Sequence, residues 1–494
     1  MNIATQFADS AATNAEKIAV FFGEDNFSYK HFKRESTALA AHLLQKNALQ
    51  PGARVAIWLK NCPEFISAFY GILQASGVGV PINNFLKPPE VSYILKDAGA
   101  NIIITDNELA EKLAEILPDH PDLRIIKTSE FADLKAASGE QPPSSSRHES
   151  DLAVIIYTSG TTGSPKGAML SHGNLLHNVA SCQHELEAVE LDRMAILLPM
   201  FHSFMLTVGV LLPTLVGGSL VLIRSLHPPK NIVMEIIKHQ ATILPAIPQL
   251  FRTLANTKLP PLPLRLCISG AAPLPVEVLN QFTDRVGIPL IEGYGLSEAS
   301  PVVSLNPIRG TRKPGSIGRP IKDVEVSIQD EQGNSLPAGE IGEVCVRGGN
   351  VMSGYWNRPD ESARTLVNDW LRTGDIGYQD EEGYFFITDR KKDMLLVNGV
   401  NVYPREIEET IYQIPGIKEA AVVGKAHPQK GEQPVAFVVT DEGAELTTDQ
   451  IREFLKERLA AFKSPREIQI CDALPRNATG KILKTKLRQR LEQA

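Results

Sequence analysis

The 494-residue chain has few cysteines and no pattern that would pair them. Its five cysteines lie far apart, and none belongs to a C-x-x-C pair: Cys62, Cys182, Cys267, Cys345 and Cys471. This argues against a disulfide framework or a zinc site and favours a reducing compartment. The first residues also lack the basic start and apolar stretch of a signal peptide, so we expect a cytoplasmic protein.

Long apolar runs and an excess of positive charge are missing as well. The longest apolar run, residues 205–219, is interrupted by Pro213 and by glycines and is short for a bilayer span. We therefore predict no integral membrane segment, while peripheral membrane contact and a homodimer stay open. The net charge of −7 does not attract nucleic acid, so we expect small-molecule partners drawn by a local basic site.

The chain does contain a dense run of hydroxyls and glycines beside a lysine. It follows an apolar, β-branched stretch at residues 152–156, and helical character begins near Leu175. Glycines allow the backbone to present N–H groups to an anion, and hydroxyls and a lysine add donors and charge. We predict a polyphosphate loop between a strand and a helix, with a plain surface turn as the alternative. Its members are Thr158, Ser159, Gly160, Thr161, Thr162, Gly163 and Lys166.

This loop is neither of two common nucleotide-binding motifs. A Walker A loop needs Gly-Lys-Ser/Thr, but Pro165 precedes Lys166 and Gly167 follows it. No G-x-G-x-x-G accompanies it, so it is not a dinucleotide fingerprint either. A different kind of nucleotide loop is required.

A second motif stands near the middle of the chain, at residues 292–298. Gly293 and Gly295 flank Tyr294, so backbone can approach a flat ligand while the ring offers a face. Ser297 can donate to a phosphate, and Glu298 can hold Mg²⁺, which prefers carboxylate oxygen. The alternative is a strand-to-helix turn capped by the serine. A hydrolase nucleophile elbow is excluded, because Ala299 occupies its last glycine position.

Three later positions have weaker signals of their own. Asp375 follows a glycine and could accept both ribose hydroxyls, although Gly-Asp is also a common turn. Gly399 marks either a hairpin or a close passage of ligand past backbone. Lys481 carries a compact charge on a long stem that could reach a phosphate oxygen, yet a lysine near the C-terminus is more often inert.

Taken in this order, the motifs resemble those of the AMP-forming adenylating superfamily, which contains acyl- and aryl-CoA synthetases, luciferases and peptide-synthetase adenylation domains. The resemblance covers residues 19–488. Ser297 replaces the family's usual threonine and keeps its hydroxyl. The resemblance implies ATP and Mg²⁺ for adenylation of a carboxylic acid, followed by transfer to CoA.

The resemblance also implies roles for individual residues. Lys481 is the expected catalytic lysine, assisted by Thr158, Glu298 and His202, and Thr158 and Glu298 are the expected Mg²⁺ ligands. Lys392 corresponds to the hinge between domains, with a solvated basic linker as the alternative, and Gly399 to the CoA tunnel. The other expected nucleotide contacts are Gly270, Ala271, Ala272, Glu292, Gly293, Tyr294, Gly295, Ser297, Asp375 and Arg390.

The expected fold is α/β. Alternating strand and helix patterns before residue 315 predict two doubly wound βα subunits, and alternating apolar and polar residues after it predict a small β-barrel-like part. A charged run at residues 389–393 suggests a boundary. We therefore expect an N-terminal ATP- and acyl-binding domain, residues 1–389, and a small mobile α+β C-terminal domain, residues 390–494.

The acyl substrate is less clearly encoded. His202 stands where peptide synthetases usually carry an Asp for the substrate amino group, so an amino-acid substrate is disfavoured. Residues 205–212 carry no charge, which suggests an apolar pocket, although a buried core helix and a core histidine explain them equally. The expected pocket residues are His202, Ser203, Phe204, Gly209, Gly270 and Gly293.

Residues 266–270, 292–301 and 401–406 look most like bacterial long-chain fatty acyl-CoA synthetases. We therefore expect a medium- or long-chain fatty acid as the substrate. An aryl-CoA ligase of the coumarate or benzoate type stays open, because residues 269–274 occur in both kinds. A fatty-acyl-AMP ligase that loads a carrier protein is a further alternative, although the extra insertion of such proteins is not visible. A non-catalytic relative is disfavoured, since no signature residue is missing.

Overall fold

Two parallel sheets form the core of the first 320 residues in the computed structural model, which describes residues 2–137, 145–158, 165–427, 431–476 and 481–493. The first sheet has the order β6-β5-β3-β4-β7-β8, and only β8 runs antiparallel. Its strands are β3 (Arg54–Trp58), β4 (Val78–Pro81), β5 (Ile102–Thr105), β6 (Arg124–Lys127), β7 (Leu152–Thr158) and β8 (Lys166–Ser171). Apolar β-branched runs suit strands that helices cover on both faces.

The second sheet has nine strands in the order β15-β14-β13-β12-β11-β9-β10-β1-β2, parallel from β13 to β1 and antiparallel at both ends. Its strands are β1 (Ile18–Phe22), β2 (Asp25–Ser28), β9 (Arg193–Ile196), β10 (Ser219–Leu222), β11 (Ile243–Ala246), β12 (Leu266–Ser269), β13 (Leu290–Gly295), β14 (Val302–Leu305) and β15 (Arg319–Pro320).

Two smaller sheets complete the structure. An antiparallel sheet contains β16 (Val324–Gln329), β17 (Gly342–Gly348), β18 (Leu366–Val367), β19 (Trp370–Gln379) and β20 (Phe385–Arg390). The C-terminal sheet contains β21 (Leu395–Val397), β22 (Val400–Val402), β23 (Ile417–His427), β24 (Gly431–Thr440) and β25 (Glu467–Ile470). The α/β fold predicted from sequence, with a large N-terminal and a small C-terminal part, is confirmed.

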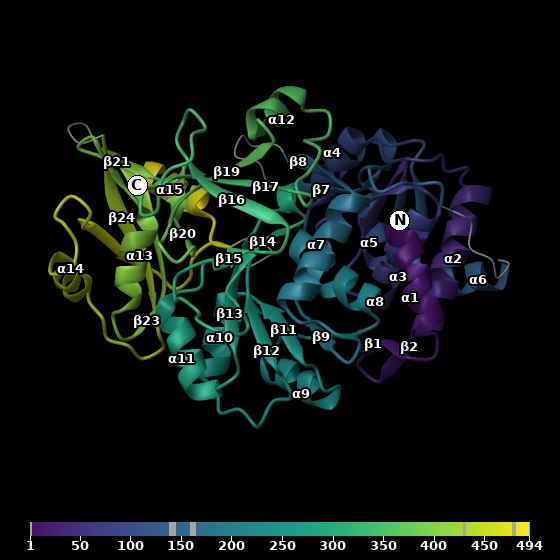
Figure 1. Cartoon of the computed structure of the whole chain (residues 1–494), viewed down its shortest axis with the longest axis horizontal. Coiled ribbons are helices and arrows are strands. Elements are labelled where there is room, and N and C mark those ends of the chain that lie inside the picture. The colour runs from purple at the N-terminus through teal and green to yellow at the C-terminus, as the bar shows by residue number, and fades with distance from the viewer. Residues whose placement is uncertain (1, 138–144, 159–164, 428–430, 477–480, 494) are drawn as a thin grey trace.

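Helices cover the sheets (Figure 1). The α-helices are α1 (Ile3–Thr13), α2 (Tyr29–Gln45), α3 (Pro63–Gln74), α4 (Pro88–Ala98), α5 (Asn107–Leu113), α6 (Phe131–Ala137), α7 (His172–Glu185), α8 (Leu212–Val216), α9 (Lys230–Lys238), α10 (Pro248–Ala255), α11 (Val276–Val286), α12 (Pro359–Thr365), α13 (Pro404–Tyr412), α14 (Thr448–Lys456) and α15 (Lys484–Gln493). Short helical turns span Leu117–Asp119, Thr128–Glu130 and Ser297–Ala299, and a π-helix spans Met205–Leu211.

One local prediction is wrong. The polyphosphate loop does not lead directly from a strand into a helix, because β8 lies between the loop and α7. β8 pairs with β7 so that Lys166 lies opposite Thr158 and Gly167 opposite Tyr157. Residues 168–170 are apolar and two of them are buried, so the cross-strand packing favours a hairpin over an earlier helix start. Ser171 then caps α7 by accepting a hydrogen bond from the Asn174 N–H.

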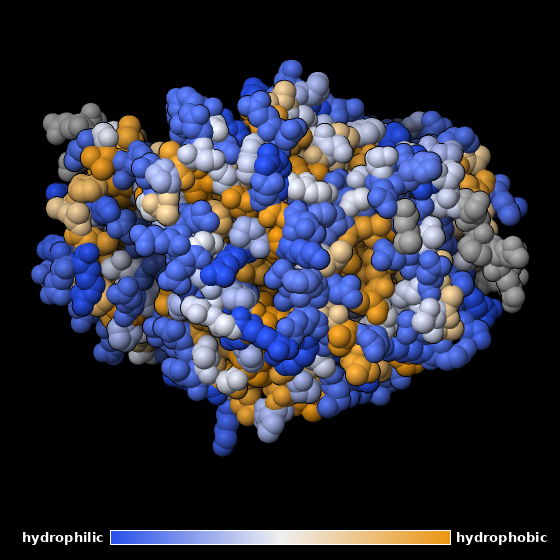
Figure 2. Space-filling view, viewed as in Figure 1, coloured by the Kyte–Doolittle hydropathy of each residue, from blue (hydrophilic) through white to orange (hydrophobic). Residues whose placement is uncertain are grey.

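The C-terminal sheet and its helices lie beside the N-terminal part, at the left of Figure 1. β20 ends in the antiparallel sheet at Arg390, and β21 begins in the C-terminal sheet at Leu395. The domain boundary predicted at residues 389 and 390 stays a prediction, and this change of sheet is compatible with it. No helix in the described part of the chain is long and apolar enough to cross a membrane. Figure 2 shows polar residues over much of one face, with apolar groups between them.

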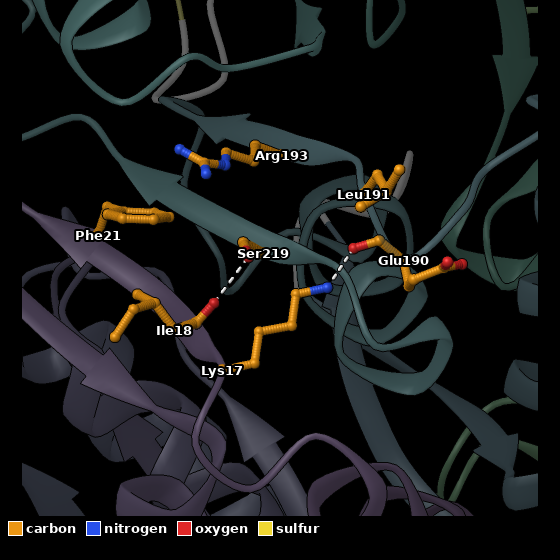
Figure 3. A pocket seen from close by; sticks show the side chains of 7 residues that line it. All are labelled: Lys17, Ile18, Phe21, Glu190, Leu191, Arg193 and Ser219. Carbon is orange, nitrogen blue, oxygen red and sulfur yellow. Dashed lines mark hydrogen bonds between the residues drawn. The ribbon is translucent and has the colours of Figure 1, made fainter.

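A cavity of about 190 Å³ lies between β1, β9 and β10 (Figure 3). Arg193 and Ser219 begin β9 and β10, so this cavity is at the amino ends of the parallel strands. The Lys17 ammonium donates to the Glu190 carbonyl and to the Gly217 carbonyl, and Ser219 donates to the Ile18 carbonyl. The polar groups here fasten β1 to its neighbours, which indicates a structural role.

Gly318 joins two sheets at a point where no side chain fits. Its φ is +84°, and an added Cβ would lie 2.0 Å from the Leu305 carbonyl. Gly287 provides a matched control, because its φ is +71° and nothing lies within 4 Å of an added Cβ. We expect Gly318→Ala to cost at least ~2 kcal/mol more than Gly287→Ala, through overpacking. Calorimetric melting of both variants measures this, and equal melting temperatures would contradict it.

Candidate active site

The predicted nucleotide residues gather at the carboxyl end of the nine-stranded sheet. Residues 270–272 directly follow β12, and β13 extends through Glu292, Gly293 and Tyr294 to Gly295. Ligands in open α/β sheets bind at this edge. Ser159, Gly160, Thr161, Thr162 and Gly163 lie outside the described residues, so their predicted role is not examined by the structure.

Asp375 is the centre of a small polar cluster. It lies opposite Arg390 in the pairing of β19 with β20, and the Arg390 Nε is 3.3 Å from the Asp375 Oδ1. The Tyr294 hydroxyl donates to the Asp375 Oδ2 at 2.5 Å. Only 6% of Asp375 is exposed. The cluster therefore brings a carboxylate, a guanidinium and an aromatic face together, which suits a ribose and its base.

Glu298 and Lys166 form a second cluster near the polyphosphate loop. The Tyr355 hydroxyl donates to the Glu298 Oε1 at 2.8 Å, and the Lys166 ammonium lies 5.5 Å from the centre of the Tyr355 ring. Lys166 also forms an ion pair with Glu361 of α12. Burial lowers the pKa of Lys166, and the Arg364 guanidinium lowers it further. Thr158 belongs to this cluster as the cross-strand partner of Lys166.

The donor set of this second cluster fits Mg²⁺. Among the described residues there is no group of three or more His, Cys, Asp or Glu side chains that would form an all-protein metal cage. Mg²⁺ typically uses one or two protein oxygens together with substrate phosphates and water. The carboxylate of Glu298 and the hydroxyl of Thr158 are oxygens of that kind, so these two residues would hold it.

Lys481 reaches the polar cluster around Asp375 from the C-terminal part of the chain. Burial lowers the pKa of its ammonium, the charges of Arg390 and Lys392 lower it as well, and Asp375 and Asp393 oppose this, so that the pKa is about 8. Its charge also contributes to the environment of His202, whose pKa burial lowers to about 4. Lys481, Asp375, Arg390 and His202 therefore share one site, although more than a hundred residues separate His202 from the other three.

The predicted acyl residues surround a tightly packed helix. Ser203 and Ser297 lie 2.9 Å apart, hydroxyl to hydroxyl, and the Phe204 ring would lie 3.2 Å from a Cβ added at Gly270. Every residue of the π-helix Met205–Leu211 is buried, so the alternative of a buried core helix describes this segment. The role of the segment in acyl binding stays a prediction.

Two glycines among the expected pocket residues have close neighbours. The Met205 sulfur would lie 2.1 Å from a Cβ added at Gly209, and Leu305 would lie 2.5 Å from one added at Gly293. An acyl chain could use the space beside Gly209 only after Met205 moves.

Lys392 lies where the chain passes from one sheet to the next, and Gly399 lies in a turn within the C-terminal sheet. Lys392 is in the turn between β20 and β21, and the Lys391 N–H donates to the Gly374 carbonyl at 2.9 Å. Gly399 forms the exposed turn between β21 and β22 with φ +79°. The role of Gly399 as a CoA contact and the role of Lys392 as a hinge stay predictions.

Glu292 is a buried acid at the contact between the two parts of the chain. It is 4% exposed, its Oε1 accepts the Leu274 N–H at 3.0 Å, and its Oε2 has no hydrogen-bond partner. Burial raises its pKa to about 7, although Arg405 of α13 lies 3.9 Å from the Oε1 and opposes the shift. Through its hydrogen bond with Leu274, Glu292 thus stabilises the loop that contains Gly270, Ala271 and Ala272.

Sequence reasoning missed several members of the site. Tyr355 and Glu361 contact the predicted Glu298 and Lys166, but both are common surface residue types and no motif distinguished them. Arg405 belongs to the family-like run 401–406, but nothing in that run indicates its contact with Glu292. These residues act through side chains that meet across separate elements, so local sequence contains no signal for them.

Family comparison agrees with this geometry. Residues 7–356 match the family described as AMP-binding enzyme, and residues 406–481 match the AMP-binding enzyme C-terminal domain. This chain belongs to the AMP-binding enzyme family. The matches lie on either side of residues 357–405, which contain Asp375 and Arg390, and they place the chain in the AMP-forming superfamily predicted from its motifs.

Relatives of this AMP-binding enzyme include CoA ligases with different substrates. A long-chain-fatty-acid–CoA ligase of Bacillus subtilis (strain 168) is 36% identical over 524 residues, which cover 97% of this chain and 92% of that protein. A feruloyl-CoA synthase of Amycolatopsis is 35% identical, covering 96% of this chain and 95% of that protein. The shared activity is that of an AMP-forming acid–CoA ligase, with ATP and CoA as substrates.

Solved structures compare well over the whole AMP-binding enzyme. ATP-bound MatB from Rhodopseudomonas palustris superposes with a TM-score of 0.92 at 32% identity, over 99% of each chain. Apo MatB gives a TM-score of 0.81 at the same identity, over 100% of this chain and 99% of that one. The arrangement found here is therefore more similar to the ATP-bound state of that protein than to its apo state.

The raised pKa of Glu292 predicts a pH-dependent difference in stability. Folded chain keeps this proton up to about pH 7, whereas the ordinary value is 4.5, so the stability that Glu292 contributes falls as pH rises through this window. Glutamine does not titrate. Relative to wild type, Glu292→Gln should therefore gain stability between pH 5 and pH 8, by roughly 1–3 kcal/mol. Denaturant midpoints at several pH values measure this, and a pH-independent difference would refute it.

Proposed function

We propose that the protein activates a medium- or long-chain fatty acid to acyl-AMP, with release of pyrophosphate, and then transfers the acyl group to CoA. The observation that carries this proposal is the position of the Lys481 ammonium next to the ion pair of Asp375 with Arg390. The ammonium of Lys481 is thereby close to a carboxylate of β19 and a guanidinium of β20. The fatty acid is favoured over other acids by the fatty acyl-CoA ligases among the relatives and by the uncharged segment 205–212.

In the first half-reaction the substrate carboxylate attacks the α-phosphate of ATP, and the bond to pyrophosphate breaks. Negative charge is redistributed over phosphate oxygens, so the protein contributes positioning and electrostatics. Lys481 bridges the carboxylate and the α-phosphate, and Lys166 contacts the outer phosphates. Asp375 accepts the ribose hydroxyls, and Tyr294 packs against the base. Mg²⁺, held by Glu298 and Thr158, neutralises phosphate charge when bound.

In the second half-reaction the CoA thiol attacks the mixed anhydride, and AMP leaves. The C-terminal domain rotates about Lys392, which withdraws Lys481 and brings Gly399 toward the acyl-AMP. Gly399 is exposed in the present arrangement, whereas Lys481 is inside the site. The higher similarity to ATP-bound MatB supports assigning this arrangement to the first half-reaction.

Two alternatives differ from this proposal, one in the acid and one in the acceptor of the acyl group. An aryl acid is supported by the similarity to a feruloyl-CoA synthase at nearly the same identity. Transfer to a carrier protein in place of CoA is the second alternative, because the same adenylate serves both acceptors.

Pyrophosphate release with octanoate, palmitate, benzoate or coumarate, each with and without CoA, distinguishes these functions. We expect palmitate or octanoate to give the highest rate, with turnover that depends on CoA. A preference for benzoate or coumarate would replace the fatty acid by an aryl acid. Release that CoA does not stimulate would indicate a carrier protein, and no release with any acid would reject the proposal.

Two variants test the use of two faces by one domain. Lys481→Ala should lower acyl-AMP formation by about 10²–10³, the scale of one lost transition-state charge contact. It should leave thioester formation from supplied acyl-AMP nearly intact. Gly399→Leu should show the opposite pattern.

Gly399→Ala is the matched control for the second variant. It introduces the same positive-φ strain with a small side chain, and nothing lies within 4 Å of the added Cβ. The difference between Leu and Ala therefore reports obstruction by the longer side chain. Equal damage to both half-reactions by Lys481→Ala and Gly399→Leu would contradict the two-face mechanism.

A further inference from the structure

An arginine of the N-terminal domain binds the C-terminal domain at several points. Arg252 is on α10, and its Nη2 donates to the Ile417 carbonyl at 2.7 Å and to both carboxylate oxygens of Asp441 at 2.9 Å. Its Nη1 donates to the Lys418 carbonyl at 2.9 Å. The side chain is 15% exposed. A planar guanidinium can satisfy several acceptors from one rigid fork, so this contact fixes orientation as well as distance.

A second residue of α10, Gln249, is connected through Glu419 to Arg476, which precedes Lys481 in the sequence. The Gln249 side-chain amide donates to the Glu419 Oε1 at 3.2 Å, and Arg476 lies 2.9 Å from the Glu419 Oε2. Glu419 is 8% exposed. One carboxylate of β23 therefore contacts both a residue of the N-terminal domain and a residue just before Lys481.

Arg476 belongs to the base of the segment that contains Lys481. It forms a β-bridge with Ile482, and the Leu483 N–H donates to the Pro475 carbonyl at 2.8 Å. β23 and β24 pair from Ile417 with Thr440 to His427 with Gly431, with a register shift between Ile417 and Glu419, so the β23 residues that Arg252 and Gln249 contact belong to the same pair of strands. A displacement of α10 relative to these strands would move the base of the Lys481 segment with it.

We propose that Arg252 and Gln249 are positioning residues that hold the C-terminal domain in the orientation that places Lys481 in the active site. This rests on the proposed function of Lys481 in adenylation. Arg252 fixes the end of the β23–β24 ladder, and Gln249 fixes Glu419, which in turn orients Arg476. The contacts involve the N-terminal domain directly, so rotation of the C-terminal domain must break them.

The first experiment measures the position of Lys481 without requiring activity. Trace acetylation of the full chain over a range of pH, read by mass spectrometry, gives the labelling rate and apparent pKa of Lys481. In wild type we expect slow labelling with an apparent pKa of about 8, because the ammonium is buried. In Arg252→Ala the limiting labelling rate at high pH should be faster, because the amine is more accessible. The apparent pKa should rise toward the ordinary value of a lysine.

Arg285→Ala is the matched control. Arg285 is on the neighbouring helix α11, and its Nη1 donates to the Ala255 carbonyl and the Asn256 Oδ1 of the same domain. This variant removes an arginine side chain whose hydrogen bonds stay within the N-terminal domain. We expect its Lys481 labelling profile to equal that of wild type.

The second experiment compares the half-reactions. Arg252→Ala should slow acyl-AMP formation by about tenfold and leave thioester formation from supplied acyl-AMP unchanged or faster. Asp441→Asn should act in the same direction more weakly, and the double variant should be no worse than Arg252→Ala, because both changes remove one contact. Should Arg252→Ala fail to fold, Asp441→Asn and Gln249→Ala provide the same comparison.

An unchanged Lys481 labelling profile in Arg252→Ala, or an equal loss in both half-reactions, would overturn the proposal. Strictly additive effects of Arg252→Ala and Asp441→Asn would overturn it too. Absence of adenylation with every acid would reject the proposed function instead, while the labelling experiment would still decide whether α10 positions Lys481.

Discussion

The burial of one lysine ammonium between two domains is the constraint on which this structure depends. A buried charge loses its hydration, which is why the pKa of Lys481 falls to about 8. Asp375 and Asp393 offset part of that loss, and an anionic phosphate would offset more. Burial of this ammonium therefore favours a ligand that carries dense negative charge.

The fold supplies the other half of this arrangement. Parallel strands direct their carboxyl ends to one edge, where β12 and β13 place residues 270–272 and 292–295 side by side. The antiparallel sheet adds Asp375 and Arg390 as neighbours across β19 and β20. Because each partner is held by strand pairing, the side chains predicted to contact the nucleotide need little reorganisation, and electrostatic stabilisation of a transition state depends on that property.

Much of this could be predicted from sequence, and the failures have physical reasons. Apolar runs located most strands of the two parallel sheets, and glycine-rich motifs predicted nucleotide contacts, several of which the fold gathers at one sheet edge. The strand β8 was missed because a short apolar run next to a helical pattern does not reveal its cross-strand partner. Contacts such as that of Arg252 with Asp441, 189 residues apart, and that of Lys166 with Glu361 depend on tertiary folding, so no local pattern records them.

The short connection between β20 and β21 limits how the small domain can travel. Only residues 391–394 separate two strands that belong to different sheets, and Lys391 is itself tied to Gly374. A connection of this length keeps the C-terminal domain close to the active site, at an effective local concentration on the order of millimolar or above. Under the proposed mechanism, the faces of the C-terminal domain that carry Lys481 and Gly399 use the same site in turn, so the presence of one excludes the other.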